Sequence, residues 1–173
     1  MDKTTSPRIT NLVVKFVLNF EITLNFLQFV LDKVDYRPKR FNGAIVKDFG
    51  VTLLVFRNGK VNVVGAKSLD GAETAMKKFC ELMGHPYTYK QMDMVNLVAT
   101  ASVGKQLNLT HIAQKFPSMI SYHPELYPAA YYTEDKHSKP KVLIFHTGKL
   151  VFTGFKSFDN VNNIYCKLLT LFQ

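Results

Sequence analysis

The chain contains an internal repeat. Residues 55–68 read Val-Phe-Arg-Asn-Gly-Lys-Val-Asn-Val-Val-Gly-Ala-Lys-Ser, and residues 144–157 read Ile-Phe-His-Thr-Gly-Lys-Leu-Val-Phe-Thr-Gly-Phe-Lys-Ser. Phe, Gly, Lys, a second Gly, a second Lys and Ser recur at one offset of 89 residues, as from Gly59 to Gly148. Such self-similarity constrains the fold more than any local pattern, because it predicts two copies of one structural unit. A pseudo-symmetric molecule of this kind suits a ligand with near-twofold symmetry of its own.

The correspondence extends through both halves. Asn11-Leu-Val matches Asn96-Leu-Val at an offset of 85 residues, and the segment 36–41 matches 122–127. An apolar stripe at helical spacing also recurs, which predicts a long amphipathic helix at the end of each half. At the 89-residue offset, Ala72, Ala75, Met76, Phe79, Cys80 and Met83 correspond to Val161, Ile164, Tyr165, Leu168, Leu169 and Phe172.

Each half is predicted to read strand, helix, three strands and long helix. Asn58-Gly59 and Thr147-Gly148 lie between apolar runs, where they predict two-residue hairpin turns. Ser68 and Ser157 are the predicted N-caps of the long helices. We expect a short tail at 1–8, one repeat at 9–88 and a second at 89–173, together one pseudo-symmetric domain. The eight predicted strands are 11–18, 44–47, 51–56, 61–66, 95–103, 129–133, 141–145 and 150–155.

Composition narrows the class of protein. Apolar residues make up 47% and charged residues 20%, so the chain can bury a core. The formal net charge of +9 favours a polyanionic partner, either nucleic acid or an acidic membrane surface. Cys80 and Cys166 fall within helical apolar patterns and are predicted to be buried thiols in a reducing compartment. The longest apolar stretch, 12–34, is interrupted by charged residues and is not expected to span a bilayer.

The hairpin strands are unusually apolar on both faces. One face can pack against the long helices, but the other usually meets water and carries charge in an antiparallel sheet. An open, uncharged face indicates a binding site. A second layer or a dimer covering that face is the alternative interpretation. The residues predicted to share the face are Leu54, Phe56, Val64, Leu143, Phe145 and Val151.

Catalytic patterns do not stand out. The five histidines lack metal-ligand spacing, and the two cysteines lie in different halves. Neither Gly-Lys pair forms a phosphate-binding loop, because the upstream Gly and the following Ser or Thr are missing. We therefore expect no enzyme activity, no cofactor and no metal.

The chain resembles the TATA-box-binding protein family from about Ile9 to Phe172. The resemblance is carried by Tyr-Arg-Pro-Lys-Arg-Phe at 36–41, the Gly-Lys hairpin that ends in Gly-Ala-Lys at 65–67, Tyr-His-Pro-Glu-Leu-Tyr-Pro at 122–128, and Leu-Ile-Phe-x-x-Gly-Lys at 143–149. It implies an α+β saddle in which two repeats form a curved antiparallel sheet of ten strands. Four helices would lie on the convex side, and DNA would bind under the concave side.

The family's mode of DNA binding implies a role for paired aromatic residues. Apolar wedges inserted between base steps of the minor groove unstack them and bend the duplex toward the major groove. The resemblance implies Phe41 and Phe56 as the wedges of the first repeat, and Tyr127 and Phe145 as those of the second. Tyr127 departs from the usual Phe, so its hydroxyl needs a polar partner at the kink.

The resemblance also implies a groove-reading floor. Asn11 and Asn96 correspond to the pair that hydrogen-bonds base edges. Asn62 and Val64 depart from the family's floor residues, and Asn42 departs beside Phe41, so the resemblance does not extend to a strict preference for consensus TATA. Groove width and flexibility still select A·T-rich sequence. The remaining floor residues implied are Val13, Leu54, Val98, Leu143, Val151 and Thr153.

Basic residues at the rim would contact phosphates, which positions the protein without reading sequence. Thr133 departs from a phosphate-contacting Arg. The phosphate contacts implied are Arg40, Lys47, Lys60, Lys67, Lys149 and Lys156.

Protein partners are implied as well. Glu125 and Leu126 resemble a patch that engages the B-type initiation factor, while Lys77 and Lys78 remain from a basic helix surface that engages other regulators, including the A-type factor. RNA polymerase would be recruited to A/T-rich promoters, in the nucleus or in a viral transcription compartment of the host cytoplasm. Two alternatives stay open: a nucleic-acid-gripping accessory domain of an enzyme, and a scaffold whose apolar face binds a protein segment that mimics DNA.

Overall fold

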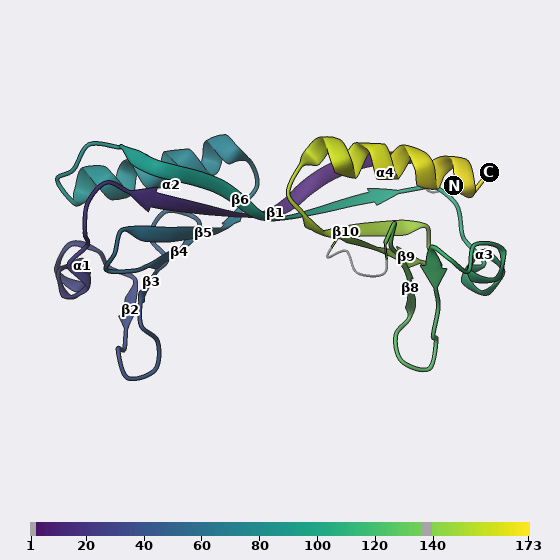
Figure 1. Cartoon of the computed structure of the whole chain (residues 1–173), viewed down its shortest axis with the longest axis horizontal. Coiled ribbons are helices and arrows are strands. Elements are labelled where there is room, and N and C mark those ends of the chain that lie inside the picture. The colour runs from purple at the N-terminus through teal and green to yellow at the C-terminus, as the bar shows by residue number, and fades with distance from the viewer. Residues whose placement is uncertain (1–2, 136–139) are drawn as a thin grey trace. The chain divides into compact units, whose positions relative to one another are not determined.

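The computed structural model describes residues 3–135 and 140–173. Within those ranges it contains ten strands and four helices, so the fold class α+β is confirmed (Figure 1). The described strand pairs are antiparallel, and the hydrogen-bonding order is β2-β3-β4-β5-β1-β6-β10-β9-β8-β7. The elements are β1 (Thr5–Leu18), α1 (Leu24–Val30), β2 (Val34–Tyr36), β3 (Ala44–Val46), β4 (Thr52–Val55), β5 (Lys60–Ala66), α2 (Leu69–Leu82), β6 (Tyr89–Ser102), α3 (Leu109–Lys115), β7 (Ile120–Ser121), β8 (Ala129–Tyr132), β9 (Lys141–Phe145), β10 (Lys149–Phe155) and α4 (Phe158–Leu171).

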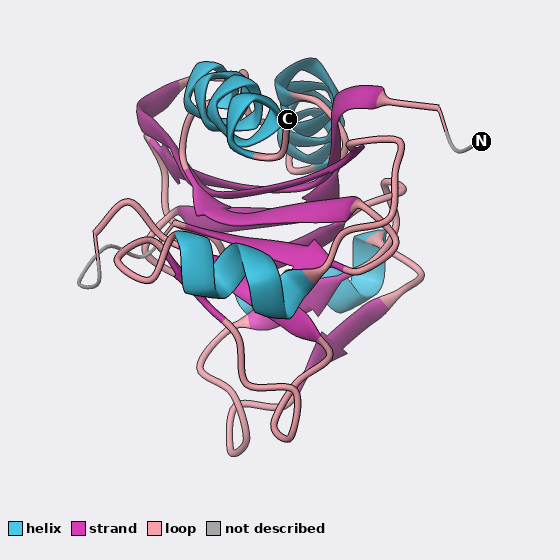
Figure 2. Ribbon diagram, turned by 90° about the vertical axis from the view of Figure 1, so that its right-hand side faces the viewer, coloured by secondary structure: helices cyan, strands magenta, loops and turns pink. Residues whose placement is uncertain are grey.

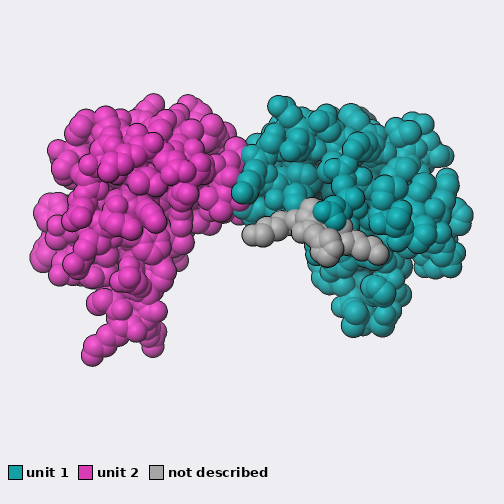
Figure 3. All heavy atoms as spheres, in the orientation of Figure 1, with its two compact units in different colours: residues 1–10, 96–173 teal, residues 11–95 magenta. Residues whose placement is uncertain are grey.

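All eight predicted strands are present, and the two that the sequence pattern did not place are the short strands β2 and β7. β1 begins at Thr5, inside the expected tail, and β6 begins at Tyr89, six residues before the strand predicted at 95–103. The chain packs as two compact units, which Figure 3 colours separately: unit 1 contains 1–10 and 96–173, and unit 2 contains 11–95. The repeat limits 9–88 and 89–173 come from matching sequence segments, which the division into packing units does not test, so they stay a prediction.

The long strands β1 and β6 explain why packing and sequence divide the chain differently. In unit 1, the Thr10 hydroxyl donates to the carbonyl of Val98, and the Tyr165 hydroxyl of α4 donates to the carbonyl of Thr5. In unit 2, the ring of Tyr89 packs edge-on against Phe16, with centroids 5.6 Å apart. Each unit therefore contains part of β1 and part of β6: residues 5–10 and 96–102 in unit 1, and residues 11–18 and 89–95 in unit 2.

Each unit places its long helix on one face of its strands (Figures 1 and 2). Alternate strand residues on that face are fully buried, as expected for a period of two. The helices contribute the predicted stripes, of which Met83 and Leu169 are half-buried and the rest buried. The core under α2 includes Leu53, Val61, Val63, Met76 and Phe79, and the core under α4 includes Val142, Ile144, Leu150, Phe152 and Leu168, all at 0% exposure.

The hairpins use a different turn from the one predicted. Gly59 N–H donates to the carbonyl of Phe56 at 3.1 Å, and Phe56 N–H donates to the carbonyl of Lys60 at 2.9 Å. Gly59 has φ +80°, whereas Asn58 does not have positive φ. A two-residue type I′ turn needs positive φ at both central residues, so the two-residue prediction is wrong. The chain forms a longer turn closed by a left-handed glycine, and Gly148 repeats it with φ +84°.

Glycine is required at both turns for a second reason. A Cβ on Gly59 would lie 2.5 Å from the carbonyl oxygen of Phe20, and one on Gly148 would lie 2.2 Å from that of Lys105. Both contacts are with backbone, which cannot rotate away. The glycine of each repeated Gly-Lys motif is thus explained by close backbone packing at the hairpins.

Two local predictions need correction. Ser68 caps α2 by accepting from Gly71 N–H at 3.0 Å, as predicted, but Ser157 at the N-cap of α4 makes no side-chain capping bond. Cys80 is buried, and burial raises its pKa to about 11, whereas Cys166 is exposed. The prediction of a buried thiol is wrong for Cys166 because it lies on the solvent side of α4.

Candidate nucleic-acid interface

The face of unit 2 opposite α2 is built from alternate residues of β1, β5 and β4. Val13 pairs with Val64 across β1 and β5, and Leu54 pairs with Asn62 across β4 and β5. These side chains are half-buried, while their neighbours along each strand are buried under α2. Every floor residue that the resemblance assigned to this unit lies on this face: Asn11, Val13, Leu54, Asn62 and Val64.

Unit 1 repeats the arrangement with β6, β10 and β9. Val151 pairs with both Leu143 and Thr100, which places apolar and hydroxyl side chains side by side. No charged side chain stands among the five assigned residues. Asn96, Val98, Leu143, Val151 and Thr153 are all half-buried.

An aromatic pair borders the open face of unit 2. The rings of Phe41 and Phe56 meet nearly edge-to-face with centroids 5.5 Å apart, and both are half-buried. Gly43 permits this approach, because a Cβ there would lie 2.9 Å from Phe41 Cε1 and 3.1 Å from Phe56 Cδ1. The exposed Asn42 stands between Phe41 and this glycine in the chain. The two rings predicted to act together are therefore brought together.

A second pair occupies the corresponding place in unit 1. Tyr127 and Phe145 lie with ring centroids 6.5 Å apart, and Tyr131 lies 5.8 Å from Tyr127. Tyr127 is 38% exposed, more than the half-buried Phe145. Its backbone N–H donates to the carbonyl of His123, which closes the loop before β8. The second pair is looser than the first, and its exposed ring carries a hydroxyl.

The two asparagines differ in their hydrogen bonds. Asn96 Oδ1 accepts from Gly154 N–H at 3.0 Å, a contact permitted by the left-handed bulge at Gly154, whose φ is +81°. Asn11 Oδ1 is buried without a hydrogen-bond partner among the described residues. In both residues the carbonyl oxygen is turned inward, which leaves the amide NH₂ group as the donor available to a ligand.

The basic residues assigned to phosphate contact are all exposed. Beside them, Arg37 donates to the carboxylate of Asp35, and this hydrogen bond lowers the pKa of Asp35, helped by the nearby charges of Arg40 and Lys47. Unit 2 holds Arg40, Lys47, Lys60 and Lys67, and unit 1 holds Lys149 and Lys156. Thr133 is half-buried just after β8.

The residues assigned to protein partners lie on two other surfaces. Leu126 is 80% exposed in the loop before β8, and Glu125 beside it lies 3.6 Å from His123 Nδ1. Lys77 and Lys78 are exposed on α2, where Lys77 Nζ stands 5.6 Å from the ring centroid of Tyr87. These side chains are exposed to solvent, so neither surface is needed for packing of the core.

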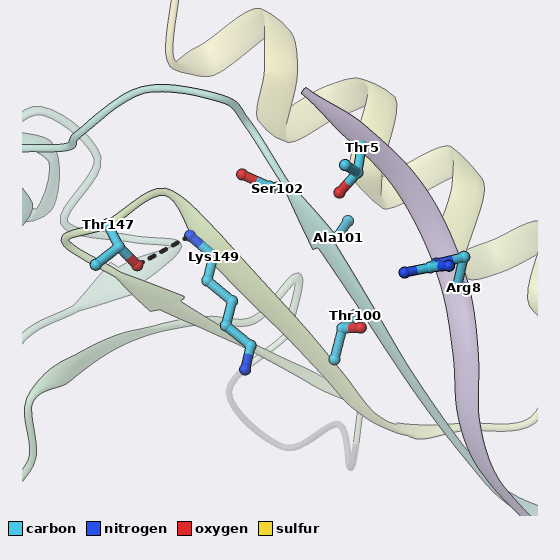
Figure 4. A pocket seen from close by; sticks show the side chains of 7 residues that line it. All are labelled: Thr5, Arg8, Thr100, Ala101, Ser102, Thr147 and Lys149. Carbon is cyan, nitrogen blue, oxygen red and sulfur yellow. Dashed lines mark hydrogen bonds between the residues drawn. The ribbon is translucent and has the colours of Figure 1, made fainter. Parts of the chain in front are cut away.

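Sequence reasoning missed three charged residues of the open faces, namely Lys15, Asp93 and Arg8. Lys15 of β1 forms an ion pair with Asp93 of β6 at 2.7 Å in unit 2. In unit 1, Arg8 and Lys149 line a pocket between β1, β6 and β10 (Figure 4). The 85-residue offset relates Arg8 to Asp93 and Lys15 to Thr100. Extending the repeat to these positions would therefore have indicated that they belong to the open faces. Arg8 was missed because 1–8 was interpreted as a tail.

Two searches gave negative results for the described residues. In 3–135 and 140–173, no group of three or more His, Cys, Asp or Glu residues is placed to hold a metal ion. In the same ranges, no helix has the length and apolar character needed to cross a membrane.

Comparisons with known proteins agree on one family. The family model described as transcription factor TFIID, or TATA-binding protein, matches residues 6–85 and again 91–173. The TATA-box-binding protein of Tetrahymena thermophila is 31% identical over 97% of this chain and 72% of its own length, and that of Methanococcus maripaludis is 34% identical over 94% and 92%. Among solved structures, the Methanococcus jannaschii TBP matches with a TM-score of 0.86 and 33% identity, covering 96% of this chain and 98% of that one.

Proposed function

This chain belongs to the TATA-box-binding protein family, and from that premise we propose that it is a general transcription initiation factor that binds the minor groove of A/T-rich promoter DNA. The observation that carries the proposal is the repeated open face, which is uncharged at the ten assigned floor positions and bordered in each unit by a pair of aromatic rings. Each unit would contact one half of the DNA site.

The chemistry of the floor fits the minor groove. A·T pairs present only the acceptors adenine N3 and thymine O2 there, so a reader needs donors and shape more than a detailed hydrogen-bond pattern. Asn11 and Asn96 have inward carbonyl oxygens, and their amide groups can donate to these acceptors. The apolar neighbours then exclude water and favour close contact with the groove.

The aromatic pairs supply the means to bend DNA. Half-buried rings at the border of an open face can leave their mutual contact and enter a base step. Phe41 and Phe56 would act in unit 2, and Tyr127 and Phe145 in unit 1. The hydroxyl of Tyr127 would have to keep a water or phosphate partner, so the kink in unit 1 is expected to be the weaker one.

Asn62 is the departure most relevant to sequence preference. It lies in register between Leu54 and Lys15, where a fully apolar floor would reject the guanine amino group. Its amide oxygen can accept from guanine N2, the one donor that G·C adds to the minor groove. We therefore propose that unit 2 tolerates a G·C pair better than unit 1, where Val151 occupies the equivalent position.

The rim and the outer surfaces complete the proposal. The six exposed basic residues would contact phosphates and make binding salt-dependent. Glu125 and Leu126 would engage a B-type initiation factor, Lys77 and Lys78 an A-type factor or another regulator, and the assembly would recruit RNA polymerase. The location would be that of the transcribed DNA, namely the nucleus, or the viral transcription compartment in the host cytoplasm if the chain is viral.

Gel shift with bend detection tests the proposal. Short duplexes with and without a central A/T-rich step are titrated at two salt concentrations, and end-to-end energy transfer reports bending. Preferred binding to the A/T-rich duplex, with bending, is expected. Tight binding of a polymerase accessory protein with no duplex affinity at either salt concentration would instead support the scaffold alternative.

A further inference from the structure

A pocket in unit 1 is lined by hydrogen-bond donors. It has a volume of about 290 Å³ and lies where β1 and β6 approach the β9–β10 hairpin (Figure 4). Arg8 and Lys149 bring two positive charges to it, and neither has an ion-pair partner among the described residues. The other polar side chains that line it carry hydroxyl groups: Thr5, Thr100, Ser102 and Thr147.

Two of these hydroxyl groups are already oriented. Ser102 Oγ accepts from Gly104 N–H at 3.1 Å, and Thr147 Oγ1 accepts from Lys149 N–H at 3.4 Å. Because their oxygens accept from backbone N–H groups in these bonds, each O–H group is left as a donor. A site with a guanidinium, an ammonium and hydroxyl donors, and with no carboxylate in its lining, is suited to an anion. The planar guanidinium fork favours phosphate geometry.

The equivalent place in unit 2 has the opposite character. The 85-residue offset converts Arg8 into Asp93 and Thr100 into Lys15. These two form an ion pair at 2.7 Å, and Gln91 Nε2 also donates to Asp93 at 2.7 Å. Lys60 is retained at the position of Lys149. In unit 2 the charge of Lys15 is therefore paired with a carboxylate of the protein itself, and that carboxylate, Asp93, stands at the position where unit 1 has the Arg8 guanidinium.

We propose that the pocket of unit 1 binds a phosphate group of the DNA backbone through Arg8 and Lys149, and that unit 2 makes no equivalent contact at Asp93. The inference rests on the proposed function, and it assigns Arg8 a role that the resemblance did not supply. Thr100 pairs in register with the floor residue Val151, so the pocket adjoins the face that would contact the groove. The phosphate contact at Arg8 would thus belong to unit 1 alone.

The test compares the salt dependence of duplex binding for the wild type and Arg8→Gln. Each neutralised phosphate contributes about 0.9 to the slope of log affinity against log salt. Arg8→Gln should therefore flatten the slope by about 0.9 and weaken binding about eightfold at 0.1 M salt. Lys115→Gln is the matched control, since it removes one charge from an exposed position of α3 in the same unit and should leave the slope unchanged.

Asp93→Asn supplies the reciprocal test. It releases Lys15 from its acid partner, so binding should tighten and the slope should steepen. An unchanged slope in Arg8→Gln, with wild-type binding intact, overturns the phosphate site and leaves the proposed function standing. Absence of duplex binding by the wild type overturns both.

A separate arm distinguishes backbone phosphate from a free anion. Inorganic phosphate is titrated against the protein without DNA, and the Arg8 side-chain N–H resonance is followed by NMR. No shift at millimolar phosphate supports a contact that forms as part of DNA binding. A saturating shift at millimolar phosphate, together with an unchanged slope in Arg8→Gln, identifies a free-anion site and overturns the backbone assignment.

Discussion

Replacing one ring of each aromatic pair should separate bending from folding. Phe56 and Phe145 are half-buried. The ring centroid of Phe56 lies 5.5 Å from that of Phe41, and the ring centroid of Phe145 lies 6.5 Å from that of Tyr127. An aromatic pair contributes roughly 0.5–1.5 kcal/mol beyond the area it buries. The double variant Phe56→Ala and Phe145→Ala should therefore lose only about 1–3 kcal/mol of folding stability from the two ring contacts.

Binding and bending should both respond to the same double variant. Stacking of a base on an aromatic ring contributes about 1–3 kcal/mol. Proteins that kink the minor groove, this family among them, meet an unstacking cost of a few kcal/mol per step. The double variant loses the stacking of two rings, about 2–6 kcal/mol, and no longer meets the unstacking cost, so the net loss of affinity should be smaller than the stacking contribution while the bend disappears.

Energy transfer across an end-labelled duplex measures the bend, and urea unfolding measures stability. Phe29→Ala is the control, because that ring is 85% exposed on α1 and should affect neither quantity. Phe79→Ala marks the opposite extreme, since a fully buried Phe should cost about 3–5 kcal/mol of folding stability. A double variant that unfolds would mean that the two rings are core residues. A folded double variant that still bends DNA would refute their role as wedges.

Three further outcomes are expected. Gly59→Ala should destabilise unit 2 by about 2 kcal/mol or more in urea unfolding, because φ is +80° and the new Cβ meets the Phe20 carbonyl; no loss would contradict the turn geometry. Asn62→Val should increase discrimination against a G·C pair in one half-site by about 1–3 kcal/mol in competition gel shifts; equal discrimination would remove the proposed acceptor role. In native protein at pH 8, Cys166 should react rapidly with a thiol reagent and Cys80 should not, because burial raises the Cys80 pKa to about 11; two rapid reactions would contradict that burial.

Much of the fold could be predicted because the repeat and the local periodicity agree. The spacing of apolar residues located both long helices, and β-rich runs around Gly59 and Gly148 located the hairpins. Turn geometry was not accessible in the same way. Asn-Gly is typical of a two-residue turn, but the approach of the Phe20 and Lys105 carbonyls to these glycines is a tertiary contact that local sequence does not record.

Surface chemistry was harder to predict than the core. The apolar stripe placed both cysteines in helices, yet one helical step decides whether a thiol meets the sheet or water, and Cys166 meets water. Lys15 of β1 and Asp93 of β6 form an ion pair although the two residues are 78 positions apart in the chain. Neither residue belongs to a motif that predicts an ion pair, and the two become neighbours only because β1 and β6 lie side by side in the sheet.

Two departures from repeat symmetry in the open faces share one direction, although a third, Val64 in unit 2 against Thr153 in unit 1, has the reverse polarity. In one pair of equivalent rows, unit 1 has Leu143, Val151 and Thr100, with Arg8 in the same pocket as Thr100, whereas unit 2 has Leu54, Asn62 and Lys15, with Asp93 ion-paired to Lys15. Unit 2 thus gains polar groups on the floor and neutralises its charge internally. In this row unit 1 keeps the apolar Val151 where unit 2 has Asn62, and the charge of Arg8 would be left for a ligand. An apolar floor residue rejects the guanine amino group, so the difference at Val151 and Asn62 would make unit 1 the more demanding reader of A·T sequence, whereas a phosphate contact at Arg8 would add affinity without reading sequence. A duplex with its A·T run confined to one half should therefore be bound in one orientation, with that half on unit 1.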